Sequence, residues 1–256
     1  MTTRDTPWPD GTPCWTDLMT TDVDAARDFY GDLLGWQFDI GPAETGYYST
    51  ALMRDRRVAG VYSMGGDHPP VWTTYLATAD ADTTADAAVR AGGTLVQPTM
   101  DVMDLGRTAV LKDPTGGTFG TWQAGTHLGM QLANETGAVI WDELMTRDYD
   151  AAKEFYAAVF SYTYTELGDE NFRYSTVEVD GNTIGGIGAM PAEVPAQVPP
   201  HWRVYFAVDD ADETVAKAVS IGAQVLRPAQ DMPYGRHADL LDPQGASFCI
   251  IRPASP

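Results

Sequence analysis

The spacing of hydrophobic and polar residues along this chain alternates between the pattern of a strand and the pattern of a helix. Apolar side chains dominate a short stretch from Cys14 to Met19, which predicts a strand. After Asp22, a residue suited to cap a helix, apolar residues recur at helical spacing until Gly35, and these are Ala26, Phe29, Tyr30, Leu33 and Leu34. Alternating stretches then predict three strands, at Gln37 to Ile40, Tyr47 to Met53 and Val58 to Met64. The predicted order is β-α-β-β-β.

The next sixty or so residues repeat this order. A strand is predicted from Trp72 to Thr78 and a helix from Asp80 to Ala91. Turn-forming Gly, Pro and Asp residues then separate three predicted strands, at Leu95 to Gln97, Arg107 to Lys112 and Thr118 to Gln123. The first half of the chain therefore contains two βαβββ modules.

The opening segment returns in the second half. WTDLMTTDVDAARDFY at residues 15–30 reappears as WDELMTRDYDAAKEFY at residues 141–156, a shift of 126 with 10 of 16 positions identical. After a proline-rich stretch from Pro191 to Pro200, the shift becomes 130 and then 129. We therefore predict two tandem domains, residues 1–125 and 138–256, joined by a linker at residues 126–137, and four modules in all.

Composition and charge narrow the class of protein. The chain has 256 residues and a formal net charge of -20, which disfavours nucleic acid and anionic membranes as partners. No apolar run is long enough to span a bilayer, and no signal peptide is recognisable, so a cytoplasmic location is expected. The only two cysteines, Cys14 and Cys249, lack metal-type spacing and are expected to be reduced structural thiols.

Three features together resemble the vicinal oxygen chelate superfamily of glyoxalases, bleomycin-resistance proteins and extradiol dioxygenases. They are the paired βαβββ modules, the D-x-D-A-A-x-x-F-Y segment, and the late D-P-x-G turn before the last strand. The resemblance implies an α+β fold in which each domain curls eight strands of a mixed sheet into a cup with helices outside. The tandem form with an opening Trp is similar to bacterial proteins labelled glyoxalase-like or hydroxylase.

The resemblance also marks where metal ligands would stand. Metal-dependent members carry His on the first strand of each module and Glu after the D-P-x-G turn. The corresponding positions here are Trp15, Trp141, Thr73, Arg203, Gly120 and Cys249. Because only the Cys249 thiol has suitable ligand chemistry, no metal and no other cofactor is predicted. A displaced site built from His201, His237 and a carboxylate remains the alternative.

Strand alternation selects the residues that share a face with the two tryptophans. The predicted ligand-binding residues are Trp15, Met19, Tyr48, Tyr75, Trp122, Trp141, Met145, Tyr174 and Tyr205. The candidate catalytic residues are Asp17, Glu143, Arg203 and His237, with Glu143 favoured as the base. Such a lining suits a flat apolar ligand. The competing interpretation is that Trp15, Trp141, Tyr75 and Tyr205 only fill the cups as core.

Three functions remain open at this point. The first is a metal-independent protein that binds an aromatic or polycyclic small molecule and transfers a proton on it. The second is an antibiotic-binding protein without catalysis, and the third is a divalent-metal-dependent lyase or dioxygenase. A small aromatic molecule is the expected partner in the first two cases, and the chain is expected to be a monomer or a homodimer.

Overall fold

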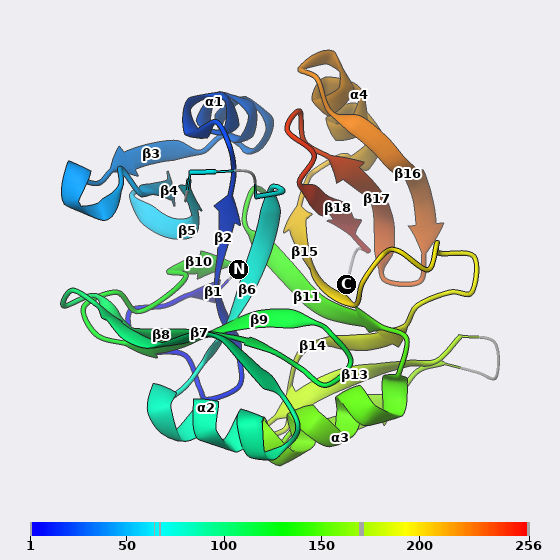
Figure 1. The fold of residues 1–256 in the computed structure, drawn as a ribbon. Helices are drawn as coiled ribbons and strands as arrows, with labels where there is room; N and C mark the ends of the chain where they lie inside the picture. Colours follow the sequence, from blue (N-terminus) through cyan, green and yellow to red (C-terminus); the bar gives the residue numbers. More distant parts are fainter. Residues whose placement is uncertain (1, 64, 67, 169–171, 255–256) are drawn as a thin grey trace.

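The two predicted domains fold as two open eight-stranded mixed sheets in a computed structural model (Figure 1). The structure describes residues 2–63, 65–66, 68–168 and 172–254. Each sheet contains two modules that meet at its centre through an antiparallel pair, β2 with β6 or β11 with β15. The tandem α+β architecture predicted from the repeat is confirmed. Met64, predicted to end a strand, lies outside the described residues.

The first sheet has the strand order β3-β4-β5-β2-β6-β9-β8-β7. Its elements, with the helices between them, are β2 Pro13–Met19, α1 Val23–Leu34, β3 Gln37–Ile40, β4 Ser49–Met53, β5 Arg56–Tyr62, β6 Val71–Ala77, α2 Ala81–Arg90, β7 Thr94–Val102, β8 Gly106–Lys112 and β9 Thr118–Ala124. A short 3-10 helix, Ala43–Thr45, precedes β4.

The second sheet repeats this order as β12-β13-β14-β11-β15-β18-β17-β16. Its elements are β11 Val139–Thr146, α3 Tyr149–Phe160, β12 Thr163–Glu166, β13 Tyr174–Val179, β14 Asn182–Ala189, β15 His201–Ala207, α4 Ala211–Ser220, β16 Gln224–Met232, β17 Gly235–Leu241 and β18 Ser247–Pro253. Each of the four helices begins at an aspartate whose side chain accepts a backbone N–H three residues later, and these caps are Asp22, Asp80, Asp148 and Asp210.

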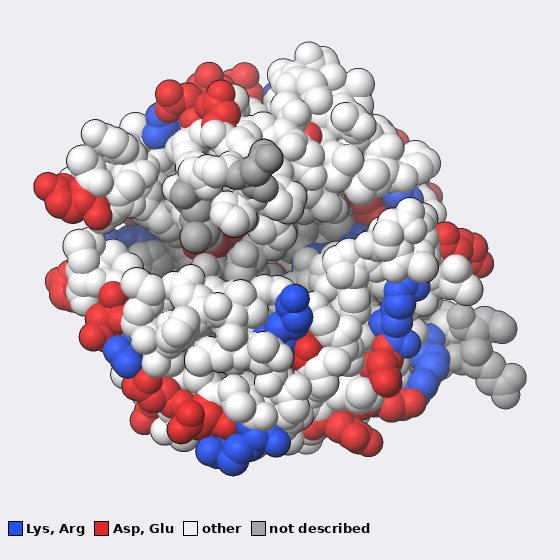
Figure 2. Space-filling view, in the orientation of Figure 1, with Lys and Arg blue, Asp and Glu red and all other residues white. Residues whose placement is uncertain are grey.

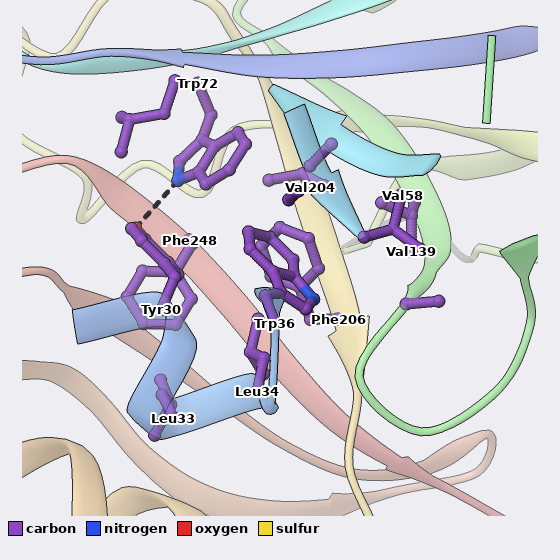
Figure 3. Close-up of a cluster of buried hydrophobic side chains, with 14 of the residues drawn as sticks. Tyr30, Leu33, Leu34, Trp36, Val58, Trp72, Val139, Val204, Phe206 and Phe248 are labelled. Carbon is purple, nitrogen blue, oxygen red and sulfur yellow. Dashed lines mark hydrogen bonds between the residues drawn. The ribbon is translucent and has the colours of Figure 1, made fainter. Parts of the chain in front are cut away.

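The helices pair across the two domains rather than within them. Helix α1 lies beside α4, and α2 lies beside α3 (Figure 1). Consequently one core cluster joins side chains of both halves: Phe206 of the second domain packs against Trp36 and Trp72 of the first, with ring centroids 5.3 Å apart in both pairs (Figure 3). The predicted domains are thus interlocked along a common interface.

Two equivalent hydrogen-bonded sets fasten this interface. The Tyr30 hydroxyl donates to Asp242 Oδ2 at 3.1 Å and accepts from Trp72 Nε1 at 2.9 Å. In the other half, the Tyr156 hydroxyl donates to Asp113 Oδ2 at 3.1 Å and accepts from Trp202 Nε1 at 3.1 Å. The second carboxylate oxygen of each Asp accepts backbone N–H groups of its own D-P turn. Each turn aspartate therefore shapes its turn and binds the opposite domain.

A further polar contact lies at the centre of the interface. Thr74 on β6 donates its hydroxyl to Asp142 Oδ1 on β11 at 2.7 Å, and both side chains are buried. Burial raises the pKa of Asp142 to about 7, with the Thr74 hydrogen bond opposing this shift and the nearby Glu143 adding to it. The Asp142 carboxyl is therefore better accommodated when protonated.

The segment predicted as a linker is packed against the body of the protein. Leu132–Ala133 forms strand β10, which pairs with β1, Thr2–Thr3, at the N-terminus. Met130 is buried, and its carbonyl accepts the Trp8 indole N–H at 2.9 Å. This connection is therefore part of the folded structure.

The charged side chains lie mainly on the surface, whereas the two thiols lie inside the protein. Figure 2 shows acidic side chains gathered over α1 and along the edge of α2 and α3, with basic side chains between them, and the formal net charge is -20. Cys14 and Cys249 are free and buried. Within the described residues, none of the helices is long and apolar enough to cross a membrane.

The interface hydrogen bonds lead to a stability prediction. Replacing Tyr30 or Tyr156 with Phe leaves a buried carboxylate oxygen and an indole N–H without their partner, so each variant should lose about 1–3 kcal/mol of unfolding free energy. Urea unfolding followed by Trp fluorescence measures this loss. Tyr47→Phe is the matched control, since Tyr47 is 59% exposed. Losses no larger than in the control would contradict the role given to these hydroxyls.

Candidate functional site

On one face of each sheet, a tryptophan, a tyrosine and an acid are linked by two hydrogen bonds. We call these three residues the relay. In the first domain, Trp15 Nε1 donates to the Tyr48 hydroxyl at 2.9 Å, and that hydroxyl donates to Asp17 Oδ2 at 3.3 Å. In the second domain, Trp141 Nε1 donates to Tyr174 at 3.0 Å, and Tyr174 donates to Glu143 Oε2 at 2.9 Å. We call the two faces the first cup and the second cup. The repeated Trp thus orients a Tyr that orients an acid.

Glycines on the neighbouring strands make room for this relay. A Cβ placed on Gly60 would lie 1.8 Å from the Tyr48 hydroxyl oxygen, and one on Gly186 would lie 2.0 Å from that of Tyr174. Both glycines pair in register with the acid of their own cup, Asp17 or Glu143. Each tyrosine side chain therefore reaches the acid through space that only a glycine leaves free.

The second cup surrounds its acid with donors. Glu143 Oε1 accepts from Arg203 Nη1 at 3.0 Å and from the Tyr205 hydroxyl at 2.7 Å. Arg203 also donates to Asp239 and, through Nη2, to the Cys249 sulfur at 3.0 Å. Burial opposes the charge on Arg203, yet its neighbours Cys249, Glu143 and Asp239 raise its pKa overall. The second cup therefore contains a buried guanidinium between two carboxylates.

His237 lies on the same face of β17 as Asp239, two residues away. It is 2% exposed, and its Nδ1 has no hydrogen-bond partner among the described residues. Its Nε2 lies 3.2 Å from the Gln230 side-chain nitrogen. Burial lowers the pKa of His237, which favours the neutral imidazole. A buried ring nitrogen without a partner is unusual and costly, which makes it a candidate contact for a ligand.

A cavity of about 520 Å³ borders the second cup at Arg203, Asp239 and Cys249, whereas Glu143, Tyr205 and His237 are not among its lining residues. Its other polar lining residues are His201, Arg227 and Ser247. Its apolar walls include Met145, Met190, Val194, Val198, Trp202 and Leu226, together with Val71 and Trp72 of the first domain. The roof is the proline-rich loop after β14, where the sequence carries its insertion. Arg147 holds this loop through the carbonyls of Val194, Pro195 and Val198 at 3.3, 2.8 and 3.1 Å.

Two aromatic residues of the first cup are buried. Trp15 and Tyr75 are 4% and 9% exposed and belong to the largest core cluster. His127, from the predicted linker, packs edge-on against Trp15 and Trp122 with ring centroids 4.4 and 5.5 Å away. Burial lowers the pKa of His127 to about 4. Trp15 and Tyr75 are thus packed among core residues, and their contact with a ligand stays a prediction.

Asp17 is the unusual group of the first cup. It is 5% exposed, and its Oδ1 has no hydrogen-bond partner among the described residues. Burial raises its pKa to about 7, although the Tyr75 and Tyr48 hydroxyls oppose the shift. Met19, also predicted here, lies two residues further along β2 and is half-buried. The first cup thus contains a carboxyl group that gains a proton near neutral pH.

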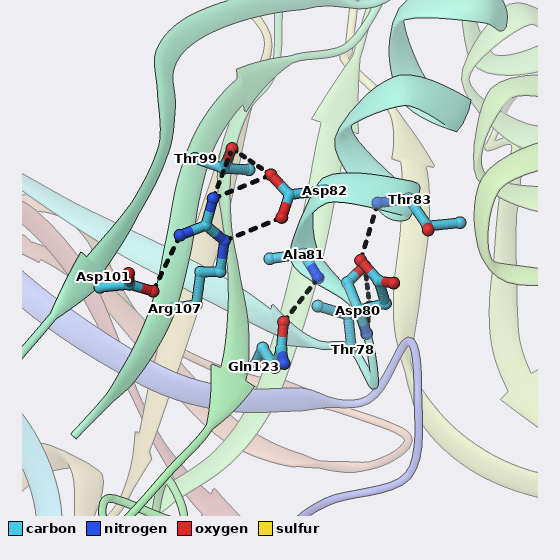
Figure 4. Close-up of polar contacts among 9 residues, drawn as sticks. All are labelled: Thr78, Asp80, Ala81, Asp82, Thr83, Thr99, Asp101, Arg107 and Gln123. Atoms are coloured by element: carbon cyan, nitrogen blue, oxygen red, sulfur yellow. Dashed lines mark hydrogen bonds and ion pairs between the residues drawn. The ribbon is translucent and has the colours of Figure 1, made fainter. Parts of the chain in front are cut away.

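Two arginines that could have reached a ligand face the surface instead. Arg107 pairs with Asp82 and Asp101 at 2.9 and 2.8 Å beside the N-terminus of α2 (Figure 4). Arg236 pairs in the same way with Asp212 and Asp231. Their role is therefore to neutralise surface acids.

The residues at the expected metal positions do not fit a divalent cation. Both tryptophans present an indole N–H that is already donated to a tyrosine, and Arg203 brings a positive charge of its own. Across the described part of the chain, no group of three or more His, Cys, Asp or Glu side chains is arranged to hold a metal. The displaced site of His201 and His237 is not formed there either.

The structure brings most of the predicted site residues together and adds others. Trp141, Glu143, Tyr174, Arg203 and Tyr205 form one connected set. Asp239, Gln230, Arg147 and the roof loop were not predicted for the second cup, nor was His127 for the first. Alternation along the strand from His237 could have indicated Asp239. No local pattern marks His127, because it reaches its cup from a connecting segment.

Comparisons with known proteins show the family to which both domains are similar. Residues 14–120 match the family model of the glyoxalase/bleomycin resistance protein/dioxygenase superfamily, and residues 138–251 match that of a glyoxalase-like domain. The chain is 43% identical over 254 residues to a Mycobacterium tuberculosis protein named "Putative glyoxylase CFP32", with 95% of each chain covered. It is 36% identical to the anthracycline biosynthesis protein DnrV of Streptomyces peucetius, with 94% of this chain and 93% of that one covered.

Solved structures share the fold at low sequence identity. The 2,2',3-trihydroxybiphenyl 1,2-dioxygenase of Sphingomonas wittichii has a TM-score of 0.66 at 11% identity, covering 95% of this chain and 91% of that one. The Mn(II)-bound glyoxalase of Novosphingobium aromaticivorans also has a TM-score of 0.66, at 15% identity, covering 95% and 82%. At such identities the likeness concerns the fold alone.

The raised pKa values lead to a pH prediction. Asp17 and Asp142 titrate near pH 7 when folded but near 3.9 when unfolded, so the folded state binds their protons more tightly. The stability that these two groups contribute is complete below about pH 4 and is lost as the pH rises through about 7.

Replacing Asp17 or Asp142 with Asn should therefore reduce the fall in stability between pH 5 and pH 8 by a few kcal/mol, since one pKa unit corresponds to about 1.4 kcal/mol. Chemical unfolding at several pH values measures it, with Asp28→Asn on exposed helix surface as control. A pH dependence unchanged from wild type would show that these carboxyls titrate normally.

Proposed function

Because the chain belongs to the glyoxalase/bleomycin resistance protein/dioxygenase superfamily, we propose that it binds a planar aromatic small molecule in its second cup, without a divalent metal ion. The observation that carries this proposal is the cavity of about 520 Å³, which falls in the range of small-molecule sites. Its walls are mainly proline, methionine, valine, leucine and aromatic side chains, and its polar lining includes Arg203, Asp239 and Arg227.

The chemistry of the walls favours a flat apolar ligand. Methionine side chains such as Met145 and Met190 adapt to irregular apolar surfaces, and aromatic rings stack on planar ones. The guanidinium and the two carboxylates nearby provide orientation rather than a large net charge. A relative named for the biosynthesis of anthracyclines, which are polycyclic aromatic compounds, supports the same class of ligand.

The duplicated cups provide a matched test of this proposal. Quinizarin, a planar dihydroxyanthraquinone, should quench the Trp fluorescence of the wild-type protein and raise its melting temperature. Met145→Trp places a bulky ring in the cavity and should weaken quinizarin binding by about tenfold or more. Met19→Trp, the equivalent change in the first cup, should leave binding within about twofold. Equal effects of the two substitutions would place the ligand outside the second cup.

A second candidate function is proton transfer on the bound molecule. The observation that favours it is the buried, unpartnered Nδ1 of His237, on the same face as Glu143 and Arg203. In this proposal Glu143 accepts the proton, while Arg203 and the neutral His237 stabilise negative charge on a ligand oxygen. Against Glu143 as base stands its set of three hydrogen-bond donors, Arg203, Tyr205 and Tyr174, which suits a carboxylate that positions its neighbours.

Mass spectrometry of hydroxyanthraquinones incubated with the protein separates catalysis from sequestration. A catalyst should yield product, and Glu143→Gln should slow its formation about 100-fold or more while the dissociation constant changes little. Asp17→Asn in the first cup serves as the control. Binding without any conversion by the wild-type protein would identify a sequestering protein, and unchanged turnover in Glu143→Gln would remove Glu143 from the base role.

A further inference from the structure

Arg203 occupies an unusual position for an arginine. Its side chain is 12% exposed, and three acceptors from three different strands converge on its guanidinium: Glu143 on β11, Asp239 on β17 and Cys249 on β18. Charged side chains are rarely buried unless they are paired with opposite charges. The second cup is thus built around a fixed cation.

In the first cup, a different residue stands at the position equivalent to Arg203. Thr73 stands opposite Asp17 where Arg203 stands opposite Glu143. The partners of Arg203 are also missing, because Val110 and Gly120 form the strand pair equivalent to Asp239 and Cys249. The single acid that remains, Asp17, has a pKa raised to about 7 by burial. Among the ion pairs of the described residues, an arginine bound directly to the acid of a cup is found in the second cup, between Arg203 and Glu143.

We propose that Arg203 is the built-in cation of the second cup and takes over the electrostatic role of a divalent metal ion. It pairs with both Glu143 and Asp239, and it presents its remaining N–H groups to an electronegative atom of the ligand. A guanidinium has five N–H donors, and the three acceptors described above leave some of them available. The ligand contact rests on the proposed function, whereas the replacement of a metal does not.

The geometry explains why a metal and this arginine exclude each other. The guanidinium keeps Glu143 and Cys249 at 3.0 Å from its nitrogens, whereas metal–oxygen and metal–sulfur bonds are about 2.0–2.3 Å long. The guanidinium thus occupies the space between the acceptors, and its positive charge repels a second cation. Removing the guanidinium leaves two carboxylates and a thiol free to converge on an ion.

Cobalt(II) titration of the full-length protein tests this proposal without any aromatic ligand. Arg203→Ala should bind one Co²⁺ per chain at least about tenfold more tightly than the wild-type protein, with the near-ultraviolet absorption of a cobalt–thiolate bond. That absorption should disappear in Arg203→Ala/Cys249→Ser. Arg203→Met, which keeps the apolar volume, provides a second neutral variant if Arg203→Ala does not fold, as judged by circular dichroism.

Two charge controls make the outcome specific. Arg227→Ala removes an exposed arginine 3.4 Å from Asp239 Oδ2 and should bind cobalt no better than wild type. Arg203→Lys keeps a positive charge in the cup and should also exclude cobalt. Cobalt–thiolate absorption in the wild-type protein, or its absence from a folded neutral variant, would overturn the proposal. So would equal cobalt binding by Arg203→Lys and Arg203→Ala, since charge would then not matter.

The ligand part is measured separately with quinizarin. Arg203→Met should weaken quinizarin binding about tenfold, and Arg203→Lys should weaken it less. Unchanged quinizarin binding by Arg203→Met would overturn the ligand contact while leaving the cobalt result to decide the replacement of a metal. If the wild-type protein does not bind quinizarin but the cobalt results are as expected, the function proposed above fails and the built-in cation stands.

Discussion

The structure depends on the reciprocal docking of a tyrosine from each domain onto the turn aspartate of the other. Tyr30 and Tyr156 come from the first helix of each domain, and Asp242 and Asp113 shape the last turn of each sheet. Since each aspartate also accepts the N–H groups of its own turn, the last strands and the opposite helices are fixed by the same carboxylates. The same frame holds the central strands β6 and β15, because Trp72 and Trp202 on these strands donate to the two tyrosine hydroxyls.

Within that common frame, the two cups differ in how they balance buried charge. A buried carboxylate must be protonated, hydrogen-bonded or paired with a cation. In the first cup, burial raises the pKa of Asp17 and so favours its protonated form, and His127 and Tyr75 pack in the same cup. In the second cup, Arg203 lies between Glu143 and Asp239 and pairs with both. A cavity of about 520 Å³ lies beside Arg203 and Asp239 of the second cup.

Most of the fold was predictable because local chemistry and the repeat agree. Asp22 and Asp148 cap their helices as predicted, and Gly35 ends α1 in the left-handed conformation. Strand β7 extends from Thr94 to Val102, well beyond the predicted Leu95 to Gln97, because an exposed edge strand containing Pro98 shows no clear alternation. His127 and the roof loop could not be predicted, since their positions depend on long-range packing. Asp239 needed only the alternation along β17, whereas its bond to Arg203 needed the curvature of the sheet.

The crossed pairing of the helices has a consequence for how such a protein can change. Two identical chains that exchanged their helices in this way would form a symmetric dimer, and every substitution would then appear in both subunits. An arginine could not enter one cup and a threonine the other. A single covalent chain removes that restriction while keeping the symmetric frame. Fusion of the two halves is therefore the physical condition under which Arg203 can stand opposite the acid of one cup and Thr73 opposite the acid of its twin.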